Sequence, residues 1–147
     1  MRKRRGPIRA GVRAGAVAAI LSGLPSTVHT LVTGGDLTES TQAVGTLLLA
    51  DDAPRGRLLA AGAATHVAIS LGWGAALAPF VPSRHPVRWG VGAGVAIAAL
   101  DIGVIGRRFA RVRALPPMPQ VADHIAFGAV VALLVSRSRD RALPGAH

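Results

Sequence analysis

Four long apolar stretches constrain the fold of this chain more than any other feature. They cover approximately residues 9–32, 58–81, 89–105 and 119–135. A helix needs about 20 predominantly apolar residues to cross the hydrocarbon core of a bilayer. The pattern therefore predicts an all-α, polytopic membrane protein with a single four-helix transmembrane domain over residues 9–136.

The composition is typical of a membrane protein. Half of the 147 residues are apolar and 16% are charged, whereas a soluble domain carries about 25% charged residues. Ala and Gly dominate the apolar stretches, and small residues of this kind let membrane helices approach one another closely. The chain has no cysteine, which excludes disulfides, thiolate metal sites and cysteine nucleophiles.

The basic residues lie where membrane proteins place them. A net charge of +10 would by itself indicate nucleic acid, but the Lys and Arg residues flank the apolar stretches, so we expect the lipid bilayer as partner and no nucleic acid. With the basic N-terminus, residues 1–8, in the cytoplasm, eleven Lys and Arg residues lie inside and six outside. This count favours a cytoplasmic C-terminus too, on a flexible tail over 137–147. The Arg107–Arg113 cluster conflicts with this orientation. Sixteen Arg against one Lys are typical of a GC-rich bacterial genome, so we expect the bacterial inner membrane.

The segment after the first apolar stretch should contain a break and a short helix. Pro25 is expected to kink or end the first helix. We expect that helix to be retained, because no small-residue cleavage site follows it; a cleaved signal peptide is the alternative. Gly34-Gly35 interrupt the chain, and Asp36 with Glu39 resembles a capping box. The helix that this box opens, over about 37–50, is too short to span and is predicted at the membrane interface.

Two pairs of segments align without gaps and predict a two-fold hairpin repeat. Gly11–Gly15 matches Gly90–Gly94, which sets Ser22 opposite Asp101. His66 with the two residues after it matches His124 with its two. Two like hairpins would be related by an axis along the membrane normal. Chance similarity between Ala- and Gly-rich helices is the alternative explanation.

Small residues recur every four positions along each apolar stretch and predict the contact faces of the helices. Residues four apart share one face of a helix, and small residues on it favour close helix packing. The faces also carry His66 and His124 and lie near Asp101, so these three side chains should point into the bundle. The faces consist of Gly11, Gly15, Ala19 and Gly23; of His66, Ser70, Gly74 and Ala78; of Gly90, Gly94 and Ala98 near Asp101; and of His124, Gly128, Ala132 and Ser136.

Five titratable residues lie inside the apolar stretches and form the candidate site. Such residues are costly in lipid and therefore indicate function by default. If the helices alternate in direction, all five lie near one membrane face. We expect His66, Asp101 and His124 to meet, with His29 and Asp123 at the periphery.

The purpose of this polar cluster has three candidate explanations. Interhelical hydrogen bonding would make the chain a structural or interaction protein, with a homo-oligomer or another membrane protein as partner. A proton relay would make it a small proton-linked transporter or channel-like protein using His66, Asp101 and His124. A divalent metal site is the third, although no H-x-x-x-H motif supports it. No hydrolase pattern is present, and Gly90–Gly94 lacks the lysine of a phosphate loop, so we expect neither an enzyme nor a bound cofactor.

Several segments together resemble those of small bacterial inner-membrane proteins with four helices. The resemblance covers most of the chain and implies a four-helix membrane class, but no activity. The residues that carry it are Gly23–Thr27, the stretch from His66 to Gly74, Asp101, and Ala122–Gly128.

Overall fold

The computed structural model describes residues 5–141, and within that range every regular element is helical. A 3₁₀ turn, η2 (Ala78–Phe80), follows α4, and a π-helical segment, η3 (Asp101–Ile105), with a 3₁₀ turn, η4 (Gly106–Arg108), follows α5. The α-helices in chain order are α1 (Arg5–Leu21), α2 (Leu24–Thr33), α3 (Glu39–Gly45), α4 (Arg55–Leu77), α5 (Pro86–Leu100), α6 (Ala110–Ala114) and α7 (Pro117–Arg141).

Four helical stretches are long and apolar enough to cross a membrane. They are Gly6–Thr33, Arg55–Phe80, Pro86–Arg108 and Pro117–Arg141. The first joins α1 and α2 across a short break, and the third joins α5 to the segments after it. The prediction of an all-α chain with four spans is confirmed, and four such helices indicate a multi-pass membrane protein.

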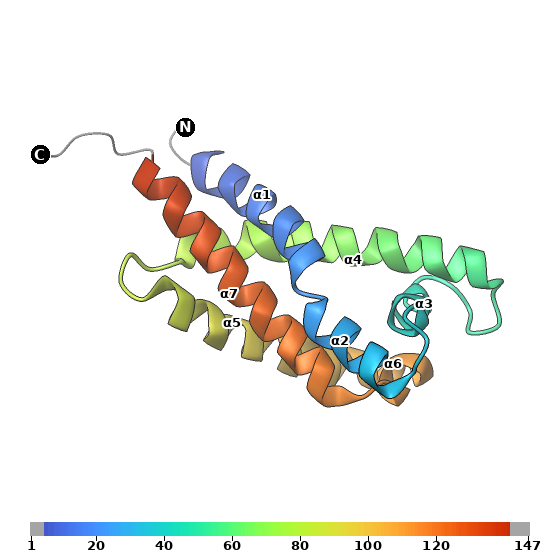
Figure 1. Ribbon diagram of the computed structural model, residues 1–147. Coiled ribbons are helices and arrows are strands. Elements are labelled where there is room, and N and C mark those ends of the chain that lie inside the picture. Colours follow the sequence, from blue (N-terminus) through green and yellow to red (C-terminus); the bar gives the residue numbers. More distant parts are fainter. Residues whose placement is uncertain (1–4, 142–147) are drawn as a thin grey trace, which may run out of the picture.

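The four stretches run in alternating directions, so the start of α1 and the end of α7 lie at one end of the molecule (Figure 1). α1 packs against both α4 and α7, and α5 packs against α7. The Arg139 guanidinium of α7 donates hydrogen bonds to the carbonyl oxygens of Ala78 and Val81 at 2.6 and 2.5 Å. This side chain therefore ties the end of α7 to the end of α4.

Glycines set the closest helix contacts. On the α1–α4 crossing, a Cβ at Gly11 would touch the Gly74 carbonyl and lie 2.6 Å from the Ala78 Cβ. On the α5–α7 crossing, a Cβ at Gly90 would touch the Gly128 carbonyl and lie 2.7 Å from the Ala132 Cβ. At both crossings a Gly of one helix packs against a Gly and the Ala four residues after it on the other helix. The two backbones can lie this close only because the glycines have no side chain. A third such contact, of Gly45 and Gly62, seats α3 on α4.

The apolar core is centred on α7, which packs against both α1 and α5. Its fully buried members include Ala18 of α1 together with Val131 and Val135 of α7. Ile97 of α5 and Phe127 of α7 extend it toward α5. Most other apolar side chains of the spans are exposed on the outer faces, as expected where lipid is the solvent.

Three boundaries differ from the sequence prediction. The expected helix over 37–50 is regular only from Glu39 to Gly45. The capping box does not form: Thr38 is the N-cap, and the Asp36 carboxylate instead accepts the Thr38 N–H at 2.8 Å. Residues 137–141 continue α7, because carbonyl groups at the end of α4 hold its last turns, whereas 142–147 of the expected tail lie outside the described residues.

Candidate intramembrane polar site

The first span is interrupted between α1 and α2. α1 ends at Leu21 and α2 begins at Leu24, with Pro25 in its first turn. Each helix end leaves four backbone groups without a partner in the helix. Gly23, the N-cap of α2, has no side chain to satisfy any of them. In the apolar part of a membrane these groups need partners from other helices.

Asp123 of α7 satisfies the start of α2. Its Oδ1 accepts a hydrogen bond from the Ser26 backbone N–H at 2.9 Å. Ser26 lies in the first turn, where N–H groups have no acceptor within the helix. The carboxylate thus acts as an N-cap supplied by a different helix.

His66 of α4 satisfies the end of α1. Its Nε2 lies 2.9 Å from the carbonyl oxygen of Ala19, which belongs to the last turn of α1, where carbonyl groups lack an in-helix donor. A carbonyl oxygen only accepts hydrogen bonds, so Nε2 carries the hydrogen in this contact.

The two side chains also match the electrostatics of the break. A helix is partially negative at its C-terminus and partially positive at its N-terminus. The imidazole of His66 faces the end of α1, and the carboxylate of Asp123 faces the start of α2. Asp123 is in addition close enough to His66 and His124 for their charges to interact. The interruption is therefore held by two oppositely chargeable side chains from α4 and α7.

A second pair joins the end of α5 to α7. His124 Nε2 lies 3.4 Å from Asp101 Oδ2, and both side chains are about one-quarter exposed. His124 Nδ1 lies 2.7 Å from the Gln120 carbonyl oxygen, to which it can only donate. With Nδ1 protonated, a hydrogen bond between Nε2 and the carboxylate needs one further proton, on either the imidazole or the carboxyl group.

Asp101 owes its position to a local distortion. It is the first residue of the π-helical segment η3, and its carbonyl accepts the Gly106 N–H. A π-turn widens the helix and occurs often at functional sites. In the repeat alignment Asp101 stands opposite Ser22, the residue at which the first span breaks. Both aligned helices thus lose regular α-geometry at matching positions.

The structure regroups the five candidate residues. It brings Asp101 and His124 together, and it sets His66 against Ala19 rather than against Asp101. His66, expected to point into the bundle, is exposed. Asp123, expected at the periphery, bonds directly to α2, whereas His29 is exposed on α2. Sequence reasoning missed the backbone partners of these side chains. Gly23 followed by Pro25 was the available signal, because a helix start without a capping side chain needs an acceptor from elsewhere.

The helix contacts shift one part of the repeat alignment by one turn. Gly15 approaches Ser70 on one crossing, and Gly94 approaches His124 on the other. Packing therefore pairs His124 with Ser70, four residues from His66. A one-turn shift keeps the small-residue face aligned and moves only the polar residues, which is why the sequence did not distinguish the two registers.

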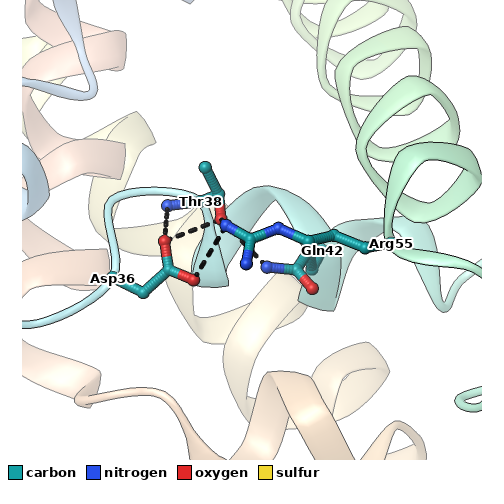
Figure 2. A network of polar contacts seen from close by, with 4 residues as sticks. All are labelled: Asp36, Thr38, Gln42 and Arg55. Atoms are coloured by element: carbon teal, nitrogen blue, oxygen red, sulfur yellow. Dashed lines mark hydrogen bonds and ion pairs between the residues drawn. The ribbon is translucent and has the colours of Figure 1, made fainter.

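A separate polar network lies in the loop before α4 (Figure 2). Asp36 Oδ1 accepts the Thr38 N–H and hydroxyl at 2.8 and 2.7 Å. Arg55 Nη2 lies 3.2 Å from Asp36 Oδ2 and 2.8 Å from the Thr38 hydroxyl, which also accepts from Gln42. The hydrogen bonds from Thr38, with a smaller contribution from Arg55, lower the pKa of Asp36 from its ordinary value. This exposed network ties the turn between α2 and α3 to the first residue of α4.

Neither a metal centre nor a related protein gives the cluster a chemistry. Across residues 5–141, no three His, Asp or Glu side chains are grouped so that they could hold a metal ion. A scan against known protein families, a search of curated proteins and a search of solved structures each found no match. Function must therefore be argued from the geometry alone.

Proposed function

We propose that this chain is a non-enzymatic, multi-pass protein of the bacterial inner membrane in which the His/Asp cluster is structural. The observation that carries the proposal is the use of His66 and Asp123 as caps on the two helix ends at the interruption. Both side chains have backbone partners, as interhelical hydrogen bonding requires. The Lys and Arg distribution favours cytoplasmic termini.

The same proposal includes an interaction role for the outer faces. A Cβ at Gly72 or Gly92 would meet nothing within 4 Å. These open small-residue faces can accept lipid or a second copy of the chain. We also propose that α3 lies at the membrane interface. The paired polar residues Asp36 and Arg55 lie before and after this helix in the chain.

A duplication of one helical hairpin accounts for the recurring contacts. Gly11 against Gly74 and Ala78 has the same residue types as Gly90 against Gly128 and Ala132. A parallel repeat of this kind has its axis along the membrane normal.

Proton-linked transport is the second candidate function. It is favoured by the paired interruptions of α1 and α5, because broken helices at corresponding positions of two halves mark binding sites in transporters. The contacting pair of His124 and Asp101, together with His66 of α4, would be the titratable element.

Separate substitutions distinguish the two functions. His66→Ala, Asp123→Ala and Asp101→Asn are compared with His29→Ala, which changes an exposed histidine of α2. The structural role predicts that the first two lower resistance to unfolding in detergent while proton flux into vesicles is unchanged. Normal folding with pH-dependent flux lost in Asp101→Asn would instead support transport.

A further inference from the structure

The attachment of α2 is unusually light for a membrane-spanning segment. None of the ten residues of α2 is buried, and the helix packs mainly against α7. Its connection to α1 passes through Gly23, where a Cβ would meet nothing within 4 Å. Among the hydrogen bonds of α2 in residues 5–141, the Ser26–Asp123 bond is the one that joins it to another helix.

That hydrogen bond depends on the charge of Asp123. A carboxylate accepts a backbone N–H in a charge-assisted bond about twice as strong as a neutral one. It is also attracted by the partial positive charge of a helix N-terminus. A proton on Asp123 removes both contributions but leaves a carbonyl oxygen that can still accept.

Protonated imidazoles near Asp123 favour its charged form, so a proton that binds to Asp123 has to overcome their attraction. His66 of α4 and His124 of α7 are close enough to Asp123 for their charges to interact with its carboxylate, and Asp101 of η3 contacts His124. His29 is exposed on α2 itself. The titratable groups of α1, Arg9 and Arg13, lie toward its other end, beyond the contact of Gly15 with Ser70. When Asp123 is neutral and the imidazoles are protonated, the positive charges face the positive end of α2 without compensation.

We propose that Asp123 is an intramembrane proton-binding site whose occupancy sets the position of α2. In the deprotonated state α2 is docked on α7, as in this structure. Proton binding weakens the cap and releases α2 from α7 about the hinge at Gly23. The inference rests on the capping role proposed above for Asp123, and it adds a regulation that a purely structural cap does not have.

A distance measurement between spin labels tests the proposal in lipid nanodiscs. The chain has no native cysteine, so labels can be attached at Val32→Cys on α2 and Val67→Cys on α4, which are 81% and 48% exposed. A pair at Ile8→Cys and Val67→Cys, on α1 and α4, is the reference. Distance distributions are recorded at about pH 8 and about pH 3, which lie on either side of the ordinary pKa values of both His and Asp.

The labelled chain with its native His/Asp cluster should give one distance between the α2 and α4 labels at the higher pH. At the lower pH it should give a second, longer distance, while the distance of the reference pair is unchanged. Asp123→Asn, which is neutral like the protonated aspartate and keeps only a carbonyl acceptor, should give the longer distance at both pH values. Asp123→Ala should be released at both, and Asp101→Asn should keep the pH response.

Two other results contradict the account at different points. If Asp123→Ala is released but the unmodified cluster does not respond to pH, the capping role stands and the proton-binding inference is wrong. If Asp123→Ala stays docked at both pH values, the capping role itself is wrong.

Discussion

At the scale of single residues, Asp123 takes the place that a Ser or Asn side chain has at an ordinary helix start. Its carboxylate reaches the Ser26 N–H from another helix, because Gly23 has no side chain to offer. His66 has the complementary place at the end of α1. An unsatisfied backbone group in lipid costs several kcal/mol, so single side chains decide whether an interrupted span is tolerated.

Removing the imidazole of His66 should therefore destabilise the bundle. We expect His66→Ala to lower the free energy of unfolding by about 1–3 kcal/mol, since the Ala19 carbonyl is left without a donor. His66→Gln keeps an N–H donor and should lose less. Unfolding in mixed detergent, followed by circular dichroism, measures both, and equal stability of His66→Ala and the unchanged chain would contradict the contact.

The Asp36 carboxyl group should titrate below its ordinary pKa. A carboxyl group with a lowered pKa in the folded state stabilises the fold above the ordinary value, and this contribution disappears as the pH falls through the lowered one. Thr38→Ala removes the largest cause of the shift, so the Asp36 pKa should rise in a carboxyl-carbon NMR titration. Thr33→Ala, in the neighbouring helix, is the control. An unchanged Asp36 pKa in Thr38→Ala would contradict the network.

At the scale of helices, backbone contact at glycines sets how α1 meets α4. A Cβ at Gly74 would touch the Gly11 carbonyl and lie 2.8 Å from the Gly15 Cα. Gly72, two residues away on the same helix, faces open space. The two glycines separate the effect of packing from that of helix propensity.

Gly74→Ala should lower stability by about 1–3 kcal/mol, as overpacking does. Gly72→Ala should be neutral or stabilise by up to about 1 kcal/mol, because Ala favours helix over Gly. The same unfolding assay checks both. A Gly74→Ala protein as stable as Gly72→Ala would mean that α1 and α4 do not cross at this point.

The helical elements were predictable from sequence to different degrees. Apolar length gave the four spans, and four-residue spacing gave the small-residue faces that meet at Gly11 and Gly90. Pro25 indicated the interruption. The π-helical segment at Asp101 has no comparable signal, because it depends on tertiary packing. The partners of His66 and Asp123 are backbone groups. Nearly every residue type has a backbone N–H and a carbonyl, so the sequence does not indicate which of them is the partner.

At the scale of the whole molecule, the alternation of the spans makes a topological prediction. The loop between α4 and α5 lies at the end where α1 begins, and the loop before α4 lies at the other end (Figure 1). Ser83→Cys and Asp52→Cys place single thiols in these two exposed loops. In intact bacterial cells an impermeant thiol reagent should label Asp52→Cys and leave Ser83→Cys unlabelled. Labelling of Ser83→Cys alone would show that both termini lie outside the cell. That opposite orientation is the one that the Arg107–Arg113 cluster favours.

The most direct test of the central claim is the hydrogen exchange of one amide. If Asp123 caps α2, the Ser26 N–H is protected in nanodiscs, and Asp123→Ala should speed its exchange roughly 2–30-fold, as the loss of an N-cap of about 0.5–2 kcal/mol implies. Asp101→Asn should leave that rate unchanged. Equal Ser26 exchange in Asp123→Ala and in the unchanged chain would contradict the account of how the interrupted span is held.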